Sequence, residues 1–117
     1  MNNYSSKYGI NEKRWRSLRE YILMRDQYLD QVEKRFGKRI EADEVHHIFP
    51  REFFPQYIYE PWNLISVSKR THNRLHDRET HKLTADGWAL LTRTARKNGI
   101  EIAPGLRDAI TMSGNLK

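Results

Sequence analysis

Four of the five histidines fall in two close pairs, and imidazoles bind metals and move protons at neutral pH. His46 and His47 are adjacent, and His72 and His76 are four residues apart. On a helix, residues four apart share one face with Cβ atoms about 5–6 Å from each other, so both imidazoles can bind one ion. His81 lies off that face, and we expect it at the surface.

The pair His46–His47 lies in a segment that alternates as a strand does, so the two side chains point to opposite sides. Only one of them can easily join His72 and His76. Three imidazoles from His46, His72 and His76 would hold one divalent ion and leave positions open for water and substrate. His47 would then be available as a general base, with activity declining below about pH 6.5 as histidines protonate. A metal ion beside a base is suited to phosphodiester hydrolysis.

Other interpretations of the histidines stay open at this point. One His-x-x-x-His on a helix is most often two solvated residues. The histidines could also form a purely structural metal site or a surface cluster beside a polyanion. The 26-residue interval from His46 to His72, in a chain with only one histidine outside the two pairs, favours a metal centre. Asp43 or Glu44 could accept a hydrogen bond from an imidazole, although solvated acids are the simpler expectation.

The elements that must position these residues begin with a helical region at 12–37. Asn11 can cap it, apolar residues recur at helical steps to Phe36, and Gly37 can end it. The region is one long helix, or two with a break near Asp26-Gln27.

Strand, loop, strand and helix are predicted for the centre of the chain. Residues 40–47 form a short strand, and three prolines interrupt the loop 48–62, whose length is typical of functional loops. A second strand covers 63–67, and Ser68 can cap a helix running to about Arg78.

A last helix begins after Thr84, with Asp86 in its first turn, and stops near Gly99. An irregular tail follows, with a turn of helix near 106–112. The 117 residues suit one domain of the α+β class, 1–117, in which helical flanks at 12–37 and 84–117 enclose a core at 40–80.

Composition narrows the possible partners and sites. The net charge of +6 and the pI near 9.7 favour a polyanionic partner, with nucleic acid first. The chain has no cysteine, which excludes disulfides, thiolate metal sites and cysteine nucleophiles. No apolar run is long enough for a membrane span and no secretion signal is visible, so we expect a cytoplasmic protein.

Three stretches together resemble the motif of the HNH nucleases. They are Val45-His46-His47-Ile48-Phe49-Pro50, Trp62-Asn63-Leu64-Ile65-Ser66-Val67 and His72-Asn73-Arg74-Leu75-His76. The paired histidines are especially similar to colicin-type nuclease domains. The stretch from Trp15 to Leu29 looks more like small HNH proteins of phages and prophages. The resemblance covers residues 13–80 and implies a ββα-metal core flanked by N- and C-terminal helices.

The resemblance implies roles for five residues. His47 is the general base, His46 and His72 are metal ligands, and His76 is a third ligand. Asn63 hydrogen-bonds the backbone of the loop between the strands and so fixes the base. The implied activity is metal-dependent hydrolysis of DNA, by nicking or double-strand cleavage, in a bacterial host cell. Three imidazoles suit Zn, Ni, Co or Mn better than Mg.

One departure from the resembling phage-type proteins concerns a structural zinc. Many of them carry two cysteine pairs, which fall at Asp30, Glu33, Ser68 and Thr71 in this sequence. These residues would make a poor zinc site, so we expect no structural metal. The N-terminal helix would then dock by apolar packing alone.

Basic residues near the motif are candidates for phosphate contacts. They are Arg51, Lys69, Arg70 and Arg74, and a solvated helix face is the alternative for each. Two other functions stay open: a non-catalytic nucleic-acid-binding protein on an HNH scaffold, and a phage packaging-associated protein whose basic surface binds a partner. The oligomeric state is open.

Overall fold

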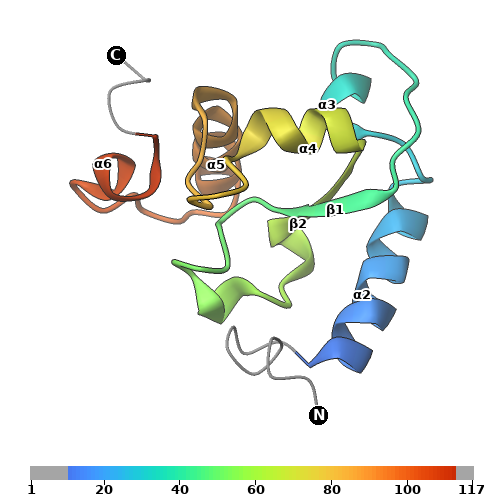
Figure 1. The fold of residues 1–117 in the computed structure, drawn as a ribbon, viewed down its shortest axis with the longest axis horizontal. Coiled ribbons are helices and arrows are strands. Elements are labelled where there is room, and N and C mark those ends of the chain that lie inside the picture. The colour runs from blue at the N-terminus through green and yellow to red at the C-terminus, as the bar shows by residue number, and fades with distance from the viewer. Residues whose placement is uncertain (1–10, 113–117) are drawn as a thin grey trace.

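A two-stranded antiparallel sheet lies at the centre of the computed structural model, which describes residues 11–112 (Figure 1). In chain order the helices and strands are α2 (Glu12–Arg25), α3 (Gln31–Lys34), β1 (Glu44–His47), β2 (Leu64–Val67), α4 (Lys69–Leu75), α5 (Ala85–Lys97) and α6 (Leu106–Ile110). Short 3₁₀ helices at Pro55–Tyr57 and Pro61–Asn63 occupy the loop between the strands. The α+β class predicted from the sequence is confirmed.

Each face of the sheet packs against a different apolar cluster. Val45 pairs with Ser66 and Leu64 pairs with His47 across the two strands, and both apolar residues pack with Ile22 of α2. Val67 packs on the other face with Leu75 of α4. The clusters hold α2 and α4 on opposite faces, so alternate residues of β1 are directed at different helices.

The N-terminal helical region is two helices, which resolves the alternative left open by the sequence. Asn11 caps α2 by accepting a hydrogen bond from the backbone of Arg14. The break follows Asp26, where Gln27 and Tyr28 adopt left-handed backbone angles, with φ of 59° and 56°. Such angles cannot continue a right-handed helix, so α3 starts afresh.

Polar side chains cover the edge of β2 that faces away from β1. Asp26 Oδ2 accepts a hydrogen bond from the backbone of Ser66 at 3.0 Å, and Arg25 donates to the Leu64 carbonyl at 2.8 Å. The prediction that this region docks by apolar packing alone is therefore wrong. A free strand edge presents unpaired amides and carbonyls, and the α2 terminus satisfies them.

The four positions where the resemblance places cysteines lie together as a hydrogen-bonded group. Buried Asp30 accepts from the backbones of Ser68 at 2.8 Å and Glu33 at 2.9 Å, and Ser68 Oγ accepts from the backbone of Thr71 at 3.2 Å. Burial acts to raise the pKa of Asp30, but these hydrogen bonds outweigh it and lower the pKa. The group joins the start of α3 to the start of α4.

Helix α4 ends at Leu75, three residues before the predicted end at Arg78. Thr84 hydrogen-bonds the carbonyls that a longer helix would use. Its backbone N–H donates to the Leu75 carbonyl at 3.0 Å, and its hydroxyl donates to the Arg74 carbonyl. Gly87 permits this contact, because a Cβ there would lie 2.0 Å from the Leu75 carbonyl oxygen. His76 is consequently extended, with φ −150° and ψ 158°, and the prediction that it lies on the helix is wrong.

The remaining boundaries differ little from the prediction. The first strand is shorter than 40–47, and Glu41 makes only an isolated bridge to Leu29. Thr84 caps α5 as predicted, and α5 ends two residues before Gly99. No helix within residues 11–112 has the length and apolar character needed to cross a membrane.

Candidate metal centre

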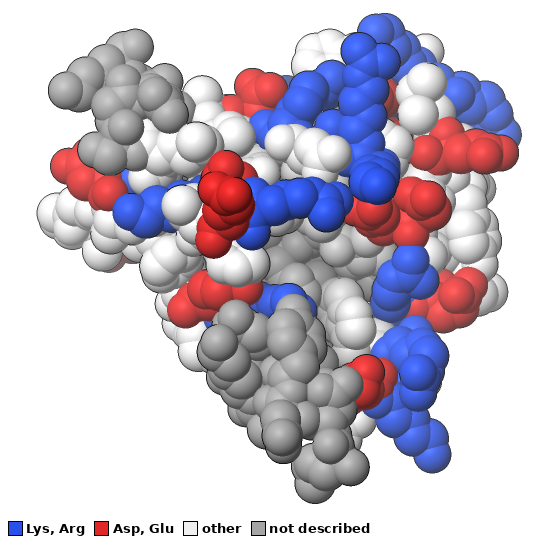
Figure 2. Space-filling model, viewed as in Figure 1, with Lys and Arg blue, Asp and Glu red and all other residues white. Residues whose placement is uncertain are grey.

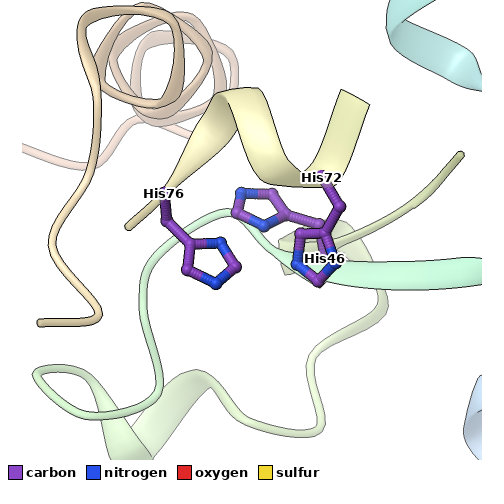
Figure 3. Close-up of side chains that lie close together, drawn as sticks. All are labelled: His46, His72 and His76. Carbon is purple, nitrogen blue, oxygen red and sulfur yellow. The ribbon is translucent and has the colours of Figure 1, made fainter. Parts of the chain in front are cut away.

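Three imidazoles from separate segments gather beneath α4 (Figure 3). His46 comes from β1, His72 from α4, and His76 from the extended residue that follows α4. Their ring centroids are 4.6 to 5.6 Å apart, and one nitrogen of each lies within 4.8 Å of the others. The sequence predicted this trio, although His76 reaches it from an extended backbone rather than from a helical face.

His46 is the most buried member, with 2% of its surface exposed. Its Nε2 is buried and has no hydrogen-bond partner. Burial first, and then the charges of His72 and His76, hold the pKa of His46 well below its usual range. A neutral imidazole with an unpartnered buried nitrogen is costly unless a ligand satisfies it. This atom and its two neighbours fit a divalent cation.

Glu44 orients the second imidazole of the trio. Its Oε1 accepts a hydrogen bond from His72 Nδ1 at 2.6 Å, which leaves Nε2 of His72 with the lone pair. A carboxylate behind a ligating imidazole fixes its tautomer and raises its basicity as a ligand. The simpler expectation of a solvated acid is wrong for Glu44, whereas Asp43 is exposed.

His47 points to the opposite side of β1, as strand alternation predicts. Its ring stacks on Trp15 of α2, with centroids 4.9 Å apart and planes 20° from parallel. His47 Nε2 lies 3.1 Å from the Ile58 carbonyl oxygen. Because a carbonyl only accepts, Nε2 carries the proton and Nδ1 has the lone pair.

Burial is the main reason why the pKa of His47 falls to about 4. The charges of Arg51 and His72 lower it further, and the hydrogen bond to Ile58 opposes the shift. The ring therefore stays neutral at pH values well below about 6.5, the ordinary histidine pKa assumed from the sequence. His47 becomes protonated only at a more acidic pH than the sequence predicted.

Asn63 makes the backbone contacts that the sequence predicted for it. It is fully buried, its Oδ1 accepts from the Phe49 amide at 2.7 Å, and its Nδ2 donates to the carbonyls of Phe49 at 3.3 Å and Tyr57 at 3.2 Å. It thus joins two distant parts of the loop 48–62. Ile58, which holds His47, directly follows Tyr57.

Of the four predicted phosphate contacts, only Arg51 lies beside the histidines. Lys69 and Arg70 line a separate hollow, and Arg74 lies 3.4 Å from Glu33. Figure 2 shows basic side chains gathered over α3, α4 and the loop after α3, with acidic side chains among the basic ones elsewhere on this face.

The histidines open into one hollow, the histidine pocket, which contains His46, His47, His72, His76 and His81. Its charged residues are balanced, with Arg19 and Arg51 against Glu44 and Glu52. Glu52 lies 3.5 Å from His81 Nδ1.

The sequence prediction missed Trp15 and Arg19 as pocket residues. It placed His81 at the surface, and the His81 side chain is 40% exposed although it also lines the pocket. A left-handed backbone at His81, with φ 62°, turns that residue back toward the pocket. Helical spacing cannot reveal such a turn. Trp15 and Arg19 are four apart on α2, a signal that the sequence did contain.

Comparisons of the chain with protein-family models, curated proteins and solved structures find no match. The function must therefore be inferred from the chemistry of the pocket.

Proposed function

We propose that this protein is a metal-dependent endonuclease of the HNH type that hydrolyses DNA phosphodiester bonds, with β1, β2 and α4 as its ββα-metal core. One observation carries the proposal: β1 directs His46 into a three-imidazole cluster on one side and a separately held, neutral His47 to the other. Ligands and a base on opposite sides of one strand are close in space but do not compete for the same ion.

His46, His72 and His76 would hold one divalent ion, and three imidazoles suit Zn, Ni, Co or Mn better than Mg. When bound, the ion supplies stabilisation of the charge on the phosphate and on the leaving oxygen. Glu44 supports the site by fixing the tautomer of His72.

His47 would take the proton of the attacking water at Nδ1. The imidazolium that forms is stabilised through Nε2, which donates to the Ile58 carbonyl, and stacking on Trp15 holds the ring plane. Asn63 acts through the backbone, because it fixes Tyr57 and hence the neighbouring carbonyl that orients His47. Arg51 and Arg19 line the pocket and would contact phosphate oxygens there.

A crossed pair of variants tests these roles. Supercoiled plasmid is incubated with wild-type protein, His47→Ala and His72→Ala across Zn, Ni, Co, Mn and Mg, and metal binding is measured by calorimetry. His47→Ala should bind metal as the wild type does yet cleave about 10²–10⁴-fold more slowly, the usual contribution of a general base. His72→Ala should lose both metal binding and cleavage.

Equal cleavage by wild type and His47→Ala would overturn the assignment of the base. Metal binding that survives in His72→Ala would overturn the ligand set. Absence of cleavage by the wild type with every ion, at a measured metal occupancy, would favour a non-catalytic DNA-binding protein.

A further inference from the structure

A second hollow lies at the other edge of the sheet, along β2, and encloses about 650 Å³ compared with about 320 Å³ for the histidine pocket. We name it the cationic groove for the basic residues that line it: Arg25, Arg35, Arg93, Arg96 and Lys97. They come from the end of α2, the end of α3 and the last turns of α5. Trp62, Ile65 and Leu90 contribute apolar surface.

The groove has almost no countercharge. Among the described residues, Asp26 is the only acidic one that lines the groove, and both of its carboxylate oxygens accept from Arg25 at 2.9 and 3.0 Å. Within residues 11–112, no ion pair involves Arg35, Arg93, Arg96 or Lys97. The groove therefore keeps an excess of positive charge, unlike the balanced histidine pocket.

Two of these cations are held together against their mutual repulsion. Arg93 is partly buried, and burial first and the Arg35 guanidinium second lower the pKa of Arg93. A guanidinium stays charged at neutral pH all the same. Like charges held close beside apolar surface are relieved when an anion binds between them.

We propose that the cationic groove is a second DNA site, which binds the sugar–phosphate backbone of the substrate away from the scissile bond. The proposal rests on the proposed endonuclease function, which makes DNA the partner. Phosphate contacts supply most of the sequence-independent affinity for DNA. The groove offers four cations free of described ion pairs, whereas the two pocket arginines stand beside two acids.

The shape of the groove agrees with a nucleic-acid strand. Arg96 and Lys97 follow Arg93 by three and four residues on α5, so both lie on the same side of the helix as Arg93. Arg35 lines the same groove from α3, and apolar groups of Trp62 and Ile65 are available to sugars or bases. A cationic groove with aromatic surface is typical of proteins that bind an extended strand.

Binding is tested without cleavage, in EDTA, with fluorescein-labelled DNA of about 20 nucleotides in single-stranded and duplex form at about 50 to about 200 mM NaCl. Two variants remove groove charge: Arg35→Ala/Arg93→Ala, and Arg96→Ala/Lys97→Ala, whose side chains are exposed. Lys13→Ala/Arg16→Ala removes the same charge from an exposed part of α2 and is the matched control. Thermal melts establish that each variant is folded.

Each groove variant should bind DNA about tenfold more weakly near 100 mM NaCl, and the slope of log K against log salt should fall by about 1.4 to 1.8. A larger loss with single strands identifies an unpaired strand as the occupant, and a larger loss with duplex identifies the duplex. Equal slopes for the groove variants and the control would overturn the proposal. So would unchanged DNA binding combined with lost binding of a polyglutamate peptide, which would indicate an acidic protein partner.

The two proposals fail separately. If the protein never cleaves DNA but the groove variants reduce the salt dependence of DNA binding, the endonuclease proposal is wrong and the proposed DNA site in the groove is supported. A protein that cleaves DNA while its groove variants bind as the wild type does refutes only the groove.

Discussion

The hollows at the two edges of the central sheet differ in their balance of charge. Along β1, the histidine pocket contains the neutral imidazoles of His46 and His47, together with two glutamates and two arginines. Along β2, the cationic groove gathers basic side chains around one acid that is already paired. If both proposals hold, catalysis and affinity for DNA lie in separate regions of the molecule, and substitutions in one region should leave the other unchanged.

Coulombic repulsion gives a physical reason for this separation. A guanidinium beside the imidazole cluster repels a divalent cation and, as Arg51 does to His47, lowers the pKa of a nearby histidine. Glu52 has the opposite effect, because its negative charge raises the pKa of His76. Under the two proposals, the groove would add phosphate-binding charge to that of Arg19 and Arg51 without bringing further positive charge to the proposed metal ligands.

Replacing Asn63 should produce the largest effect, confined to the β1 side. Asn63→Ala leaves the Phe49 amide and the Tyr57 carbonyl unsatisfied in the interior, at a cost of about 2–4 kcal/mol in the free energy of unfolding. Urea denaturation measures this loss, with the exposed Asn98→Ala as control. Folded Asn63→Ala should keep groove-dependent DNA binding, and loss of that binding would break the separation.

Glu44→Gln should weaken metal binding by about 10–100-fold, because the amide no longer supplies a negative charge behind His72. Calorimetry measures the metal affinity. The neighbouring exposed residue provides the control Asp43→Asn, which should bind metal as the wild type does. Equal affinities in the two variants would show that Glu44 has no electrostatic influence on the cluster.

Acid should destabilise the metal-free protein through the histidine pocket. Burial lowers the pKa values of His46 and His47 in the folded state, so below pH ~6.5 the unfolded chain binds more protons than the folded one. Stability should therefore fall from about pH 6.5 toward pH 5, by at most about 1.4 kcal/mol per pH unit for each such histidine.

Urea denaturation in EDTA at several pH values measures this dependence. His47→Ala should flatten it, since one buried neutral imidazole is gone. A stability that does not change between about pH 6.5 and about pH 5 would contradict the burial of these rings.

The smallest effect is expected for Lys69 and Arg70. They line a hollow outside both the pocket and the groove, together with Glu41 and Asp43. Lys69→Ala/Arg70→Ala should reduce the salt slope of DNA binding by less than about 1, below the effect of the groove variants. A larger reduction in the salt slope would indicate that the main DNA-binding surface lies at the start of α4 instead of in the groove.

Local rules of the sequence predicted much of the site. Strand alternation separated His46 from His47, and the polar caps at Asn11, Ser68 and Thr84 placed three helix starts. These features depend on residues close together in the chain.

Features that depend on tertiary contacts could not be read in this way. Thr84 donates to the last carbonyls of α4 and Gly87 leaves room for this contact, which is why His76 leaves the helix. The cationic groove brings together residues as far apart in the sequence as Arg25 and Lys97, and no local sequence pattern predicts that they lie close in space. The contact between Glu44 and His72 likewise spans 28 residues.

The hydrogen bonds of Arg25 and Asp26 along β2 have a consequence for self-association. A two-stranded sheet exposes strand edges on which another chain can extend the ladder, the first step toward aggregation. Asp26 occupies the Ser66 amide and Arg25 the Leu64 carbonyl, so an incoming strand finds these two groups already engaged. Asp26→Ala would free the Ser66 amide, and light scattering should then reveal aggregates forming at protein concentrations where the wild type stays dispersed.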